Sequence, residues 1–244
     1  MNTNTFIKPT KSSREIITQM GWKPLLMLAV FLLLAPVALF LSAGSLNWLM
    51  AWLYVGIYTA LTAISRMIMM HKSPGLIAER IRAFKGEGVK EWDRALVGAM
   101  ILCWLTIFIV AGLDRRFGWR PELPVILQFA ALAITTLGYI FATWVVAVNK
   151  FFSSVIRIQK DRGHTLITTG PYQIVRHPGY AGVILSHMTT PLLLGSVWAL
   201  IPAGLTALVL IVRTAFEDRI LLEELDGYQE YTQQTRYRLL PGIW

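Results

Sequence analysis

Long runs of residues without a charge constrain this chain more than any other feature. Residues 25–46 and 96–113 carry no Asp, Glu, Lys or Arg, and each run has the roughly 18 or more apolar residues that a bilayer core requires. A segment in lipid must satisfy its own backbone hydrogen bonds, and a helix does so within the segment itself. The sequence therefore predicts an all-α, polytopic membrane protein.

Six hydrophobic segments follow one another along the chain, at about 24–42, 47–70, 95–113, 124–148, 180–194 and 197–216. The last two are short and are joined by Gly195 and Ser196, so we expect a tight helical hairpin there. The first segment is long and lacks a clear small-x-small cleavage site. It is therefore interpreted as an uncleaved span and not as a signal peptide.

The positive charge of the chain is distributed unevenly between the loops. The net charge is +9, which on its own would suggest a nucleic-acid partner. However, 19 of the 23 Lys and Arg residues lie in the N-terminal tail, in 72–94, in 150–179 and from 213 onward, whereas 114–123 holds three. Cytoplasmic loops carry such an excess. Both termini are therefore expected in the cytoplasm, and no nucleic-acid partner is expected.

The loop 73–94 contains apolar residues at helical spacing, namely Leu76, Ile77, Ile81 and Phe84, with charged residues between them. This pattern predicts a short helix that lies in the membrane interface. It could act as a lid over a site or as a connector, and the connector is the preferred interpretation.

A polar segment of unusual composition occupies residues 163–180. Its two turns, 169–172 and 177–180, each combine Gly with Pro, which restricts itself and the residue before it. Such a rigid, irregular backbone exposes N–H and C=O groups that can bind the edge of a base, and Tyr172 and Tyr180 offer ring faces to a cation. The alternative is a tight loop-to-helix junction that places basic residues at the headgroups.

A second polar cluster, 213–218, lies near the end of the last hydrophobic segment. Arg213 and Glu217 are four residues apart, so they share one face of the expected helix. An acid and a guanidinium would match the ammonium and carboxylate of an amino-acid ligand. The alternative is an ordinary ion pair worth roughly 0.3–0.5 kcal/mol, and that is the preferred interpretation for Asp218 and Arg219.

The two clusters together resemble the isoprenylcysteine carboxyl methyltransferase family, integral membrane enzymes that use S-adenosyl-L-methionine (SAM). The resemblance covers about the last hundred residues. The matching pieces are His164-Thr165-Leu166-Ile167, Gly170-Pro171-Tyr172, Arg176-His177-Pro178-Gly179-Tyr180, Arg213 with Glu217 and Asp218, and Tyr228 with Tyr231 ahead of Arg238-Leu239-Leu240-Pro241.

The resemblance implies a set of site residues. Glu217 is expected to bind the cofactor's ammonium, and Arg213 to act on the substrate side, so these two are the expected catalytic residues. The other expected cofactor contacts are His164, Thr165, Leu166, Ile167, Tyr172, His177, Pro178, Gly179 and Tyr180, with Gln159 as the nearest candidate for a Gln whose spacing differs. Two departures are Asp218, where the family has a second Glu, and the shortened Leu225-Asp226-Gly227, which leaves the C-terminal cap of the site undefined.

The resemblance also implies an activity and an organisation. The chain 1–244 is expected to be one membrane-embedded domain, with spans in 1–150 and a cofactor-binding, catalytic region on the cytoplasmic side in 151–244. The expected reaction moves the SAM methyl group to a lipophilic or small acceptor, with a prenylcysteine-type carboxylate favoured. A small-thiol S-methyltransferase and a phospholipid N-methyltransferase remain alternatives, and whether His177 or a Tyr must serve as a base is open.

A transporter or scaffold is the alternative of another class. A transporter should place ionisable groups at mid-bilayer, and His187 is the candidate at that depth, although a hydrogen-bonded packing role is preferred for it. The four His residues show no ligand spacing that would indicate a metal. No Ser lies in a turn suited to a nucleophile, and the one Cys, Cys103, lies in a hydrophobic run.

Overall fold

The computed structural model describes residues 22–84, 89–119 and 121–244, and all regular structure within these ranges is helical. The all-α expectation is therefore confirmed. The helices in chain order are α2 (Lys23–Ala43), α3 (Leu49–Lys72), α4 (Pro74–Phe84), α5 (Glu91–Phe117), α6 (Val125–Val148), α7 (Pro178–Leu193), α8 (Leu200–Glu224) and α9 (Tyr228–Gln234), with 3-10 turns η1 (Lys160–Arg162) and η2 (Gly170–Gln173) between α6 and α7.

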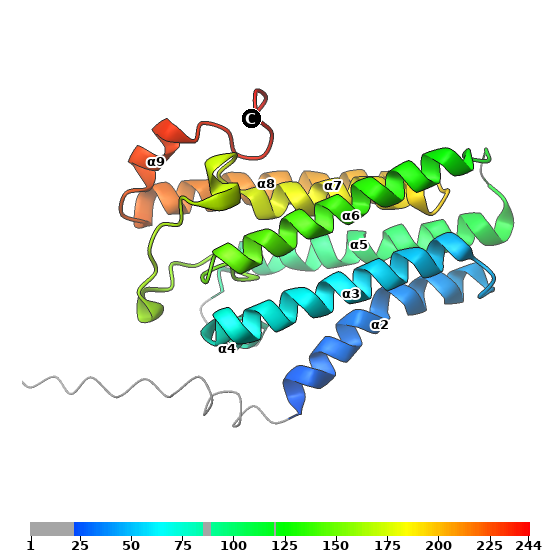
Figure 1. Cartoon of the computed structure of the whole chain (residues 1–244), viewed down its shortest axis with the longest axis horizontal. Coiled ribbons are helices and arrows are strands. Elements are labelled where there is room, and N and C mark those ends of the chain that lie inside the picture. Colours follow the sequence, from blue (N-terminus) through cyan, green and yellow to red (C-terminus); the bar gives the residue numbers. More distant parts are fainter. Residues whose placement is uncertain (1–21, 85–88, 120) are drawn as a thin grey trace, which may run out of the picture.

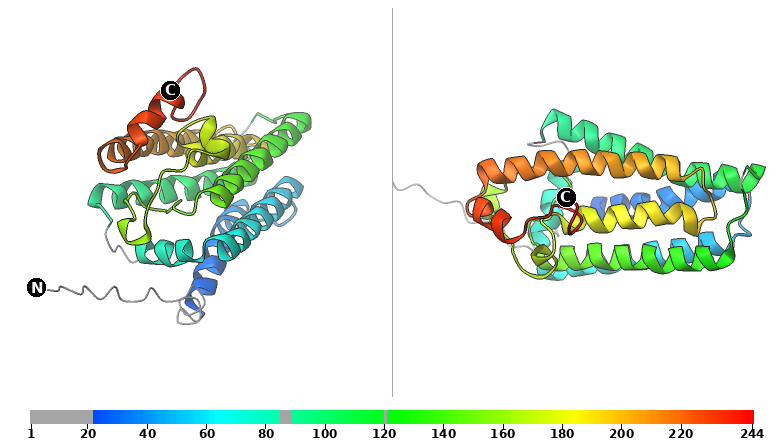
Figure 2. Two further views of the ribbon diagram at one scale, coloured as in Figure 1. Left: turned by 60° about the vertical axis from the view of Figure 1, so that its left-hand side comes forward. Right: turned by 90° about the horizontal axis from the view of Figure 1, so that it is seen from above.

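The long helices run up and down and form one elongated bundle (Figure 1). The short connections after α2, α5 and α7 lie at one end of it. The other end carries α4, the long segment 149–177 and α9, as the view from above also shows (Figure 2). The polar clusters that are far apart in sequence are thus brought to the same end.

Four helices, α3, α5, α6 and α8, are long and apolar enough to cross a membrane by length and composition. Large apolar side chains such as Leu102, Ile126 and Leu137 are exposed on their outer faces, where lipid rather than water would cover them. The polytopic membrane architecture is confirmed. Six spanning segments stay a prediction, because the apolar part of α2 is 28–43 and α7 has 16 residues.

α8 is longer than expected, since it continues from the apolar stretch to Glu224. Its last turns stay helical because Leu221 packs against Tyr228 and Tyr231 of α9. α5 likewise begins at Glu91, before its apolar run, with acidic residues in its first turn that favour the positive end of the helix dipole.

Small residues bring α6 and α7 close together. A Cβ at Gly138 would lie 2.3 Å from Ser186 Oγ and 2.9 Å from the carbonyl oxygen of Gly182, so any larger residue would force the helices apart. Backbone approach through small residues is the usual way in which helices pack in lipid. This contact fixes where α7 begins, and therefore where the polar segment ends.

The short helix expected in 73–94 is present as α4, whose Leu76 is buried against Met69 of α3 and Val146 of α6. The side chain of Phe84 lies outside the described residues. So do Lys8, Lys11, Arg14, Lys85 and Arg120, which contribute to the charge asymmetry.

Candidate cofactor site

The segment 149–177 folds back over the ends of α8 and α9 and forms a cavity there. The cavity has about 780 Å³ of empty space, its open mouth included. Among the expected cofactor contacts, Pro178 alone does not line it; the lining includes Gln159, His164, Thr165, Leu166, Ile167, Tyr172, His177, Gly179, Tyr180 and Glu217.

Residues 164–167, which have no regular secondary structure, form one wall of this cavity. Within the described parts of the chain, no hydrogen bond engages the backbone N–H or C=O groups of Thr165, Leu166 or Ile167. Backbone groups normally find partners unless they face solvent or a ligand. This wall therefore offers a row of donors and acceptors of the kind that orients a planar heterocycle.

His164 begins that wall as a neutral imidazole. Burial, followed by the charge of Arg162, lowers the pKa of His164 to about 4. Its Nδ1 accepts a hydrogen bond from the Gln159 backbone N–H at 3.3 Å, and its ring lies tilted against the Phe151 ring, with centroids 4.4 Å apart. The proton therefore resides on Nε2, which is left as a donor.

Gln159 lines the cavity but holds the loop together with its amide. Its Nε2 donates to the Phe151 carbonyl at 2.7 Å, and its Oε1 accepts from Arg162 Nη1. Both ends of the fully buried amide are thus engaged by the loop itself. The geometry assigns it to shaping the cavity wall.

Tyr180 and Glu217 meet at the opposite side of the cavity. The Tyr180 hydroxyl donates to Glu217 Oε2 at 2.5 Å, whereas no donor among the described residues reaches Oε1. The Arg213 guanidinium lies 5.5 Å from the centroid of the Tyr180 ring, and the His177 ring lies nearly parallel to it at 6.0 Å between centroids. A carboxylate oxygen is thus left free beside an aromatic face.

Arg213 lies behind Tyr180, outside the lining, and pairs with Asp93 of α5 instead of Glu217. Its Nε lies 2.8 Å from Asp93 Oδ1, and its Nη2 donates to the Ser154 carbonyl at 2.9 Å. Asp93 Oδ2 also accepts from the Ile156 backbone N–H at 2.8 Å. The local ion pair considered for Arg213 and Glu217 is therefore not formed, and the expected substrate-side role of Arg213 stays a prediction.

Asp218 is a buried junction, so its interpretation as part of an ordinary exposed pair is wrong. It accepts from Arg176 at 2.9 and 3.0 Å, and it also contacts His177, Tyr228 and Arg238. Arg219 instead forms the exposed pair, with Glu223 at 2.8 Å. Because its partners come from the start of α7, from α9 and from the C-terminal tail, Asp218 ties three segments together behind the cavity.

α9 closes the cavity from the side. The Tyr231 hydroxyl donates to the Tyr172 carbonyl at 2.6 Å, and the Tyr172 hydroxyl accepts from Asn149 Nδ2 at 2.6 Å. Burial raises the pKa of Tyr172 well above its usual range, so the phenol keeps its proton. The shortened turn before α9 works because Gly227 takes a positive φ of 77°, which L side chains rarely adopt.

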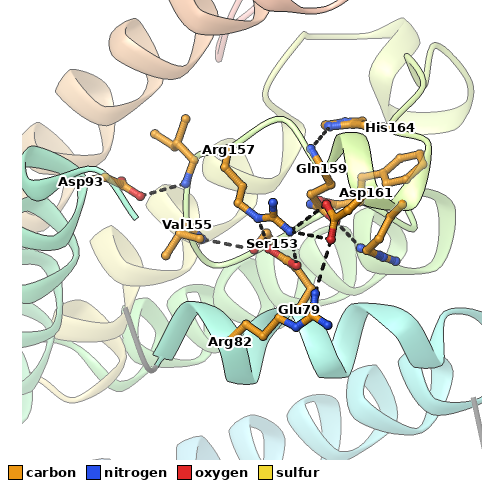
Figure 3. A network of polar contacts seen from close by, with 12 residues as sticks. Glu79, Arg82, Asp93, Ser153, Val155, Arg157, Gln159, Asp161 and His164 are labelled. Carbon is orange, nitrogen blue, oxygen red and sulfur yellow. Dashed lines mark hydrogen bonds and ion pairs between the residues drawn. The ribbon is translucent and has the colours of Figure 1, made fainter. Parts of the chain in front are cut away.

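Ion pairs between side chains connect α4 to the segment 149–177, the cavity loop (Figure 3). Arg157 makes a bidentate pair with buried Glu79, both contacts 2.6 Å, and also reaches Asp161 at 3.1 Å. Arg82 contacts the same Asp161 at 3.4 Å. The hydrogen bonds to Glu79 raise the pKa of Arg157. α4 is thus a fixed support of the cavity loop in this conformation.

Sequence reasoning missed Asp93, Glu79 and Asn149. Each is a polar residue at the end of an apolar helix or on the short interfacial one, and its partner is distant in sequence. The signal that was available is the cost of burying a charge beside a span. That cost implies a partner for each acid but does not say which one.

Two further expectations concern other sites. Among the described residues, no three His, Cys, Asp or Glu side chains gather as a metal site would require. His187, for which a hydrogen-bonded packing role was expected, lies beside Trp104 with ring centroids 6.5 Å apart, and its buried Nδ1 has no hydrogen-bond partner in the described part of the chain.

Residues 129–223 match the model of the isoprenylcysteine carboxyl methyltransferase (ICMT) family. A probable protein-S-isoprenylcysteine O-methyltransferase of Oryza sativa subsp. indica is 31% identical over 124 residues, 47% of this chain and 62% of that protein. Protein-S-isoprenylcysteine O-methyltransferase B of Arabidopsis thaliana is 32% identical over 94 residues, 38% and 45% of the two chains.

A structure of the eukaryotic intramembrane Ras methyltransferase ICMT aligns over 90% of this chain and 86% of its own, at 17% identity and a TM-score of 0.48. This chain spans 62% or less of the length of the two O-methyltransferases from Oryza sativa subsp. indica and Arabidopsis thaliana. The region that carries the segment 149–177, the start of α7 and the polar end of α8 is thus the region in which the sequence similarity to the isoprenylcysteine carboxyl methyltransferase family lies.

Proposed function

We propose that this protein is an integral membrane methyltransferase that transfers the methyl group of SAM to a lipophilic carboxylate of the prenylcysteine type. The observation that carries the proposal is the free carboxylate oxygen of Glu217 beside the Tyr180 ring, across a cavity from unpaired backbone groups. The matched relatives are named as isoprenylcysteine O-methyltransferases, which supports the choice of acceptor.

The residues of the cavity fit the parts of SAM. Glu217 suits the ammonium group, because a charge-assisted hydrogen bond to a partly buried carboxylate is a strong one. The backbone of 165–167 suits the edge of the adenine, with His164 Nε2–H as a further donor. The rings of Tyr172 and Tyr180 suit the positively charged sulfur. When bound, SAM supplies a methyl group activated by that sulfonium.

The rest of the site positions the acceptor and excludes water. A carboxylate acceptor is already a nucleophile at neutral pH, so this chain need not provide a base for it. The aromatic residues of the cavity, Phe152, Tyr228 and Tyr231 among them, lower the local polarity, which strengthens each electrostatic contact inside. Orientation and desolvation are therefore the contributions that we assign to the protein.

The cavity end of the bundle is proposed to face the cytoplasm, together with both termini. The loops at this end hold most of the Lys and Arg residues, as cytoplasmic loops do. SAM is charged and water-soluble, so it would enter from this side. Labelling of single cysteines at Glu230 and Phe117 by a membrane-impermeant reagent tests the orientation, since only the second should react from outside intact cells.

Binding of SAM and of S-adenosylhomocysteine to the detergent-purified protein, measured by calorimetry, tests the proposal. Loss of a hydrogen bond to a charged group costs about 1.5–3 kcal/mol, so Glu217→Gln should weaken SAM binding roughly 10- to 150-fold. Glu223→Gln is the matched control, because Glu223 lies on the same helix but is exposed and paired with Arg219.

An acceptor screen follows with a farnesylated cysteine, a small thiol and phosphatidylethanolamine. Methyl transfer to the first supports the proposal, and transfer to either of the others alone replaces the acceptor. A folded wild type that binds no SAM, or a Glu217→Gln variant that binds it equally well, contradicts the assignment of the site.

A further inference from the structure

Arg80 of α4 is half-buried and has one buried donor that is unfilled. Its Nη2 donates to the Phe152 carbonyl at 2.9 Å, and its guanidinium lies 5.7 Å from the centroid of the Phe152 ring. Its Nε is buried and has no acceptor among the residues that the structure describes. A buried donor without a partner costs about 1–3 kcal/mol, more for a charged group, so the position calls for an explanation.

Arg66 of α3 is a second cation in this region. It lies one helical turn before Met69, and Met69 packs with Leu76, which lies one turn before Arg80, so the two cations are on the facing sides of α3 and α4. Arg66 is half-buried, and within the described residues it makes neither an ion pair nor a hydrogen bond. Burial, followed by the charge of Arg66, lowers the pKa of Arg80 to about 9. The protein thus holds two guanidinium groups near each other without a carboxylate between them, an arrangement that repels itself unless an anion is bound.

The acids nearest in the fold are already committed. Glu79, the residue before Arg80, has both oxygens on Arg157 at 2.6 Å. Asp161 is shared by Arg157 and Arg82, and Asp93 pairs with Arg213. Arg66 and Arg80 therefore have no carboxylate partner among the described residues of this region.

The place of the two residues indicates where an anion would come from. Arg66 lies six residues before the end of α3 at Lys72, about 9 Å at 1.5 Å per residue, which is near the level of lipid headgroups. Ile64, Met67 and Met70 on the same helix are exposed and apolar. An oxyanion there would belong to an amphiphile whose hydrocarbon part stays in the membrane.

The two residues also lie next to the cofactor cavity. Phe152, on which Arg80 packs, lines that cavity. Its ring fills the space above Gly179, where an added Cβ would come within 2.5 Å of it. The Arg80 guanidinium is thus one ring away from the cavity interior, whereas Arg213 has given Nε and Nη2 to Asp93 and Ser154.

We propose that Arg66 and Arg80 form a binding site for the oxyanion of a membrane-borne amphiphile, a carboxylate or a phosphate, beside the Phe152 wall of the cavity. If the amphiphile is the methyl acceptor, the site binds the carboxylate that is methylated, and in that case the inference rests on the function proposed above. A phospholipid phosphate has the same chemistry and would make the site a lipid anchor.

The test uses the full-length protein in phosphatidylcholine nanodiscs. The probes are a farnesylated cysteine, its neutral carboxamide and phosphatidylglycerol. The variants are Arg66→Gln and Arg80→Gln, with Arg82→Gln as the matched control because Arg82 is on the same helix but exposed. Arg66→Gln is informative even if Arg80→Gln, which loses the bond to Phe152, fails to fold.

Arg66→Gln and Arg80→Gln should weaken binding of the carboxylate probe at least tenfold, and Arg66→Gln, which does not touch the Phe152 wall, should leave the carboxamide and SAM affinities unchanged. Loss of phosphatidylglycerol binding with unchanged carboxylate binding would also support an oxyanion site and would identify its ligand as lipid. Unchanged binding of both anions overturns the inference. A wild type that binds no SAM while the variants lose anion binding would refute the proposed function and leave this site standing.

Discussion

Replacing Asp93 by asparagine tests whether the buried pair with Arg213 holds the cavity in place. The carboxylate is fully buried and accepts from Arg213 Nε and from the Ile156 N–H, both at 2.8 Å. The neutral amide has one acceptor oxygen, so it keeps one of these bonds and leaves a guanidinium buried without its counter-charge. Removing one partner of a buried pair costs about 3–5 kcal/mol, and the retained hydrogen bond offsets about 1 kcal/mol.

We therefore expect a loss of about 3 kcal/mol in the free energy of unfolding. At 2–4 °C per kcal/mol for a chain of this size, this lowers the Tm by roughly 6–12 °C. Thermal unfolding in detergent, followed by intrinsic tryptophan fluorescence, measures it. Glu91→Gln is the matched control, because Glu91 lies in the same first turn of α5 but is exposed, and it should cost at most about 1 kcal/mol.

An Asp93→Asn protein with the same Tm as the Glu91→Gln protein would refute this reasoning. The double variant Asp93→Leu with Arg213→Met provides the complementary result. Because it removes both charges and leaves neither unpaired, it should be more stable than either single variant. If the double variant is no more stable than the single variants, the loss of stability comes from packing around α5 and α8 and not from the unpaired charge.

Two further predictions concern the cavity wall. Gly179→Ala would place a Cβ 2.5 Å from the Phe152 ring, so we expect a loss of about 1–3 kcal/mol in the free energy of unfolding and weaker SAM binding. Gly204→Ala is the control, because Gly204 has open space around it, and it should cost under about 1 kcal/mol. Equal melting temperatures of the two variants would contradict the contact with Phe152. The pKa of His164 is about 4 in the folded protein and about 6.5 when unfolded, so the unfolded chain binds the additional proton first. The stability that is present above pH 6.5 should therefore fall as the pH drops toward 4. In a pH series of melting curves, His164→Asn, which keeps an acceptor for the Gln159 N–H, should make this fall smaller. An unchanged dependence of Tm on pH would show that His164 is not the group responsible.

The architecture of the bundle could be predicted from the sequence because lipid restricts the choice of fold. A run such as 125–148 has no charged side chain and no water to satisfy its backbone, so only a helix is suitable. The end of α8 could not be placed in this way. Beyond residue 216 the helix is held by Leu221 against α9, and such packing leaves no periodic signal in a polar stretch.

The side chains of the site could be predicted only as far as the local pattern reached. The segment 163–180 carries its own turns, and most of the residues expected from it do line the cavity. Asp93 and Arg213 are 120 positions apart, and no local rule connects them. Asp218 was misjudged for the same reason, since its partners Arg176 and Arg238 are distant in sequence and come together only in the folded chain.

The brace between α4 and the cavity loop has a consequence for the design of chimeras. Glu79 and Asp93 lie upstream of the family-matched region 129–223, yet they neutralise Arg157 and Arg213 within it. Transplanting 129–223 onto the N-terminal helices of a relative would leave the buried Arg213 guanidinium without an acid and Arg157 with Asp161 alone, unless the recipient offered an acid at each position. A successful graft must therefore carry these two acids as part of the donor module, or replace both arginines together with them.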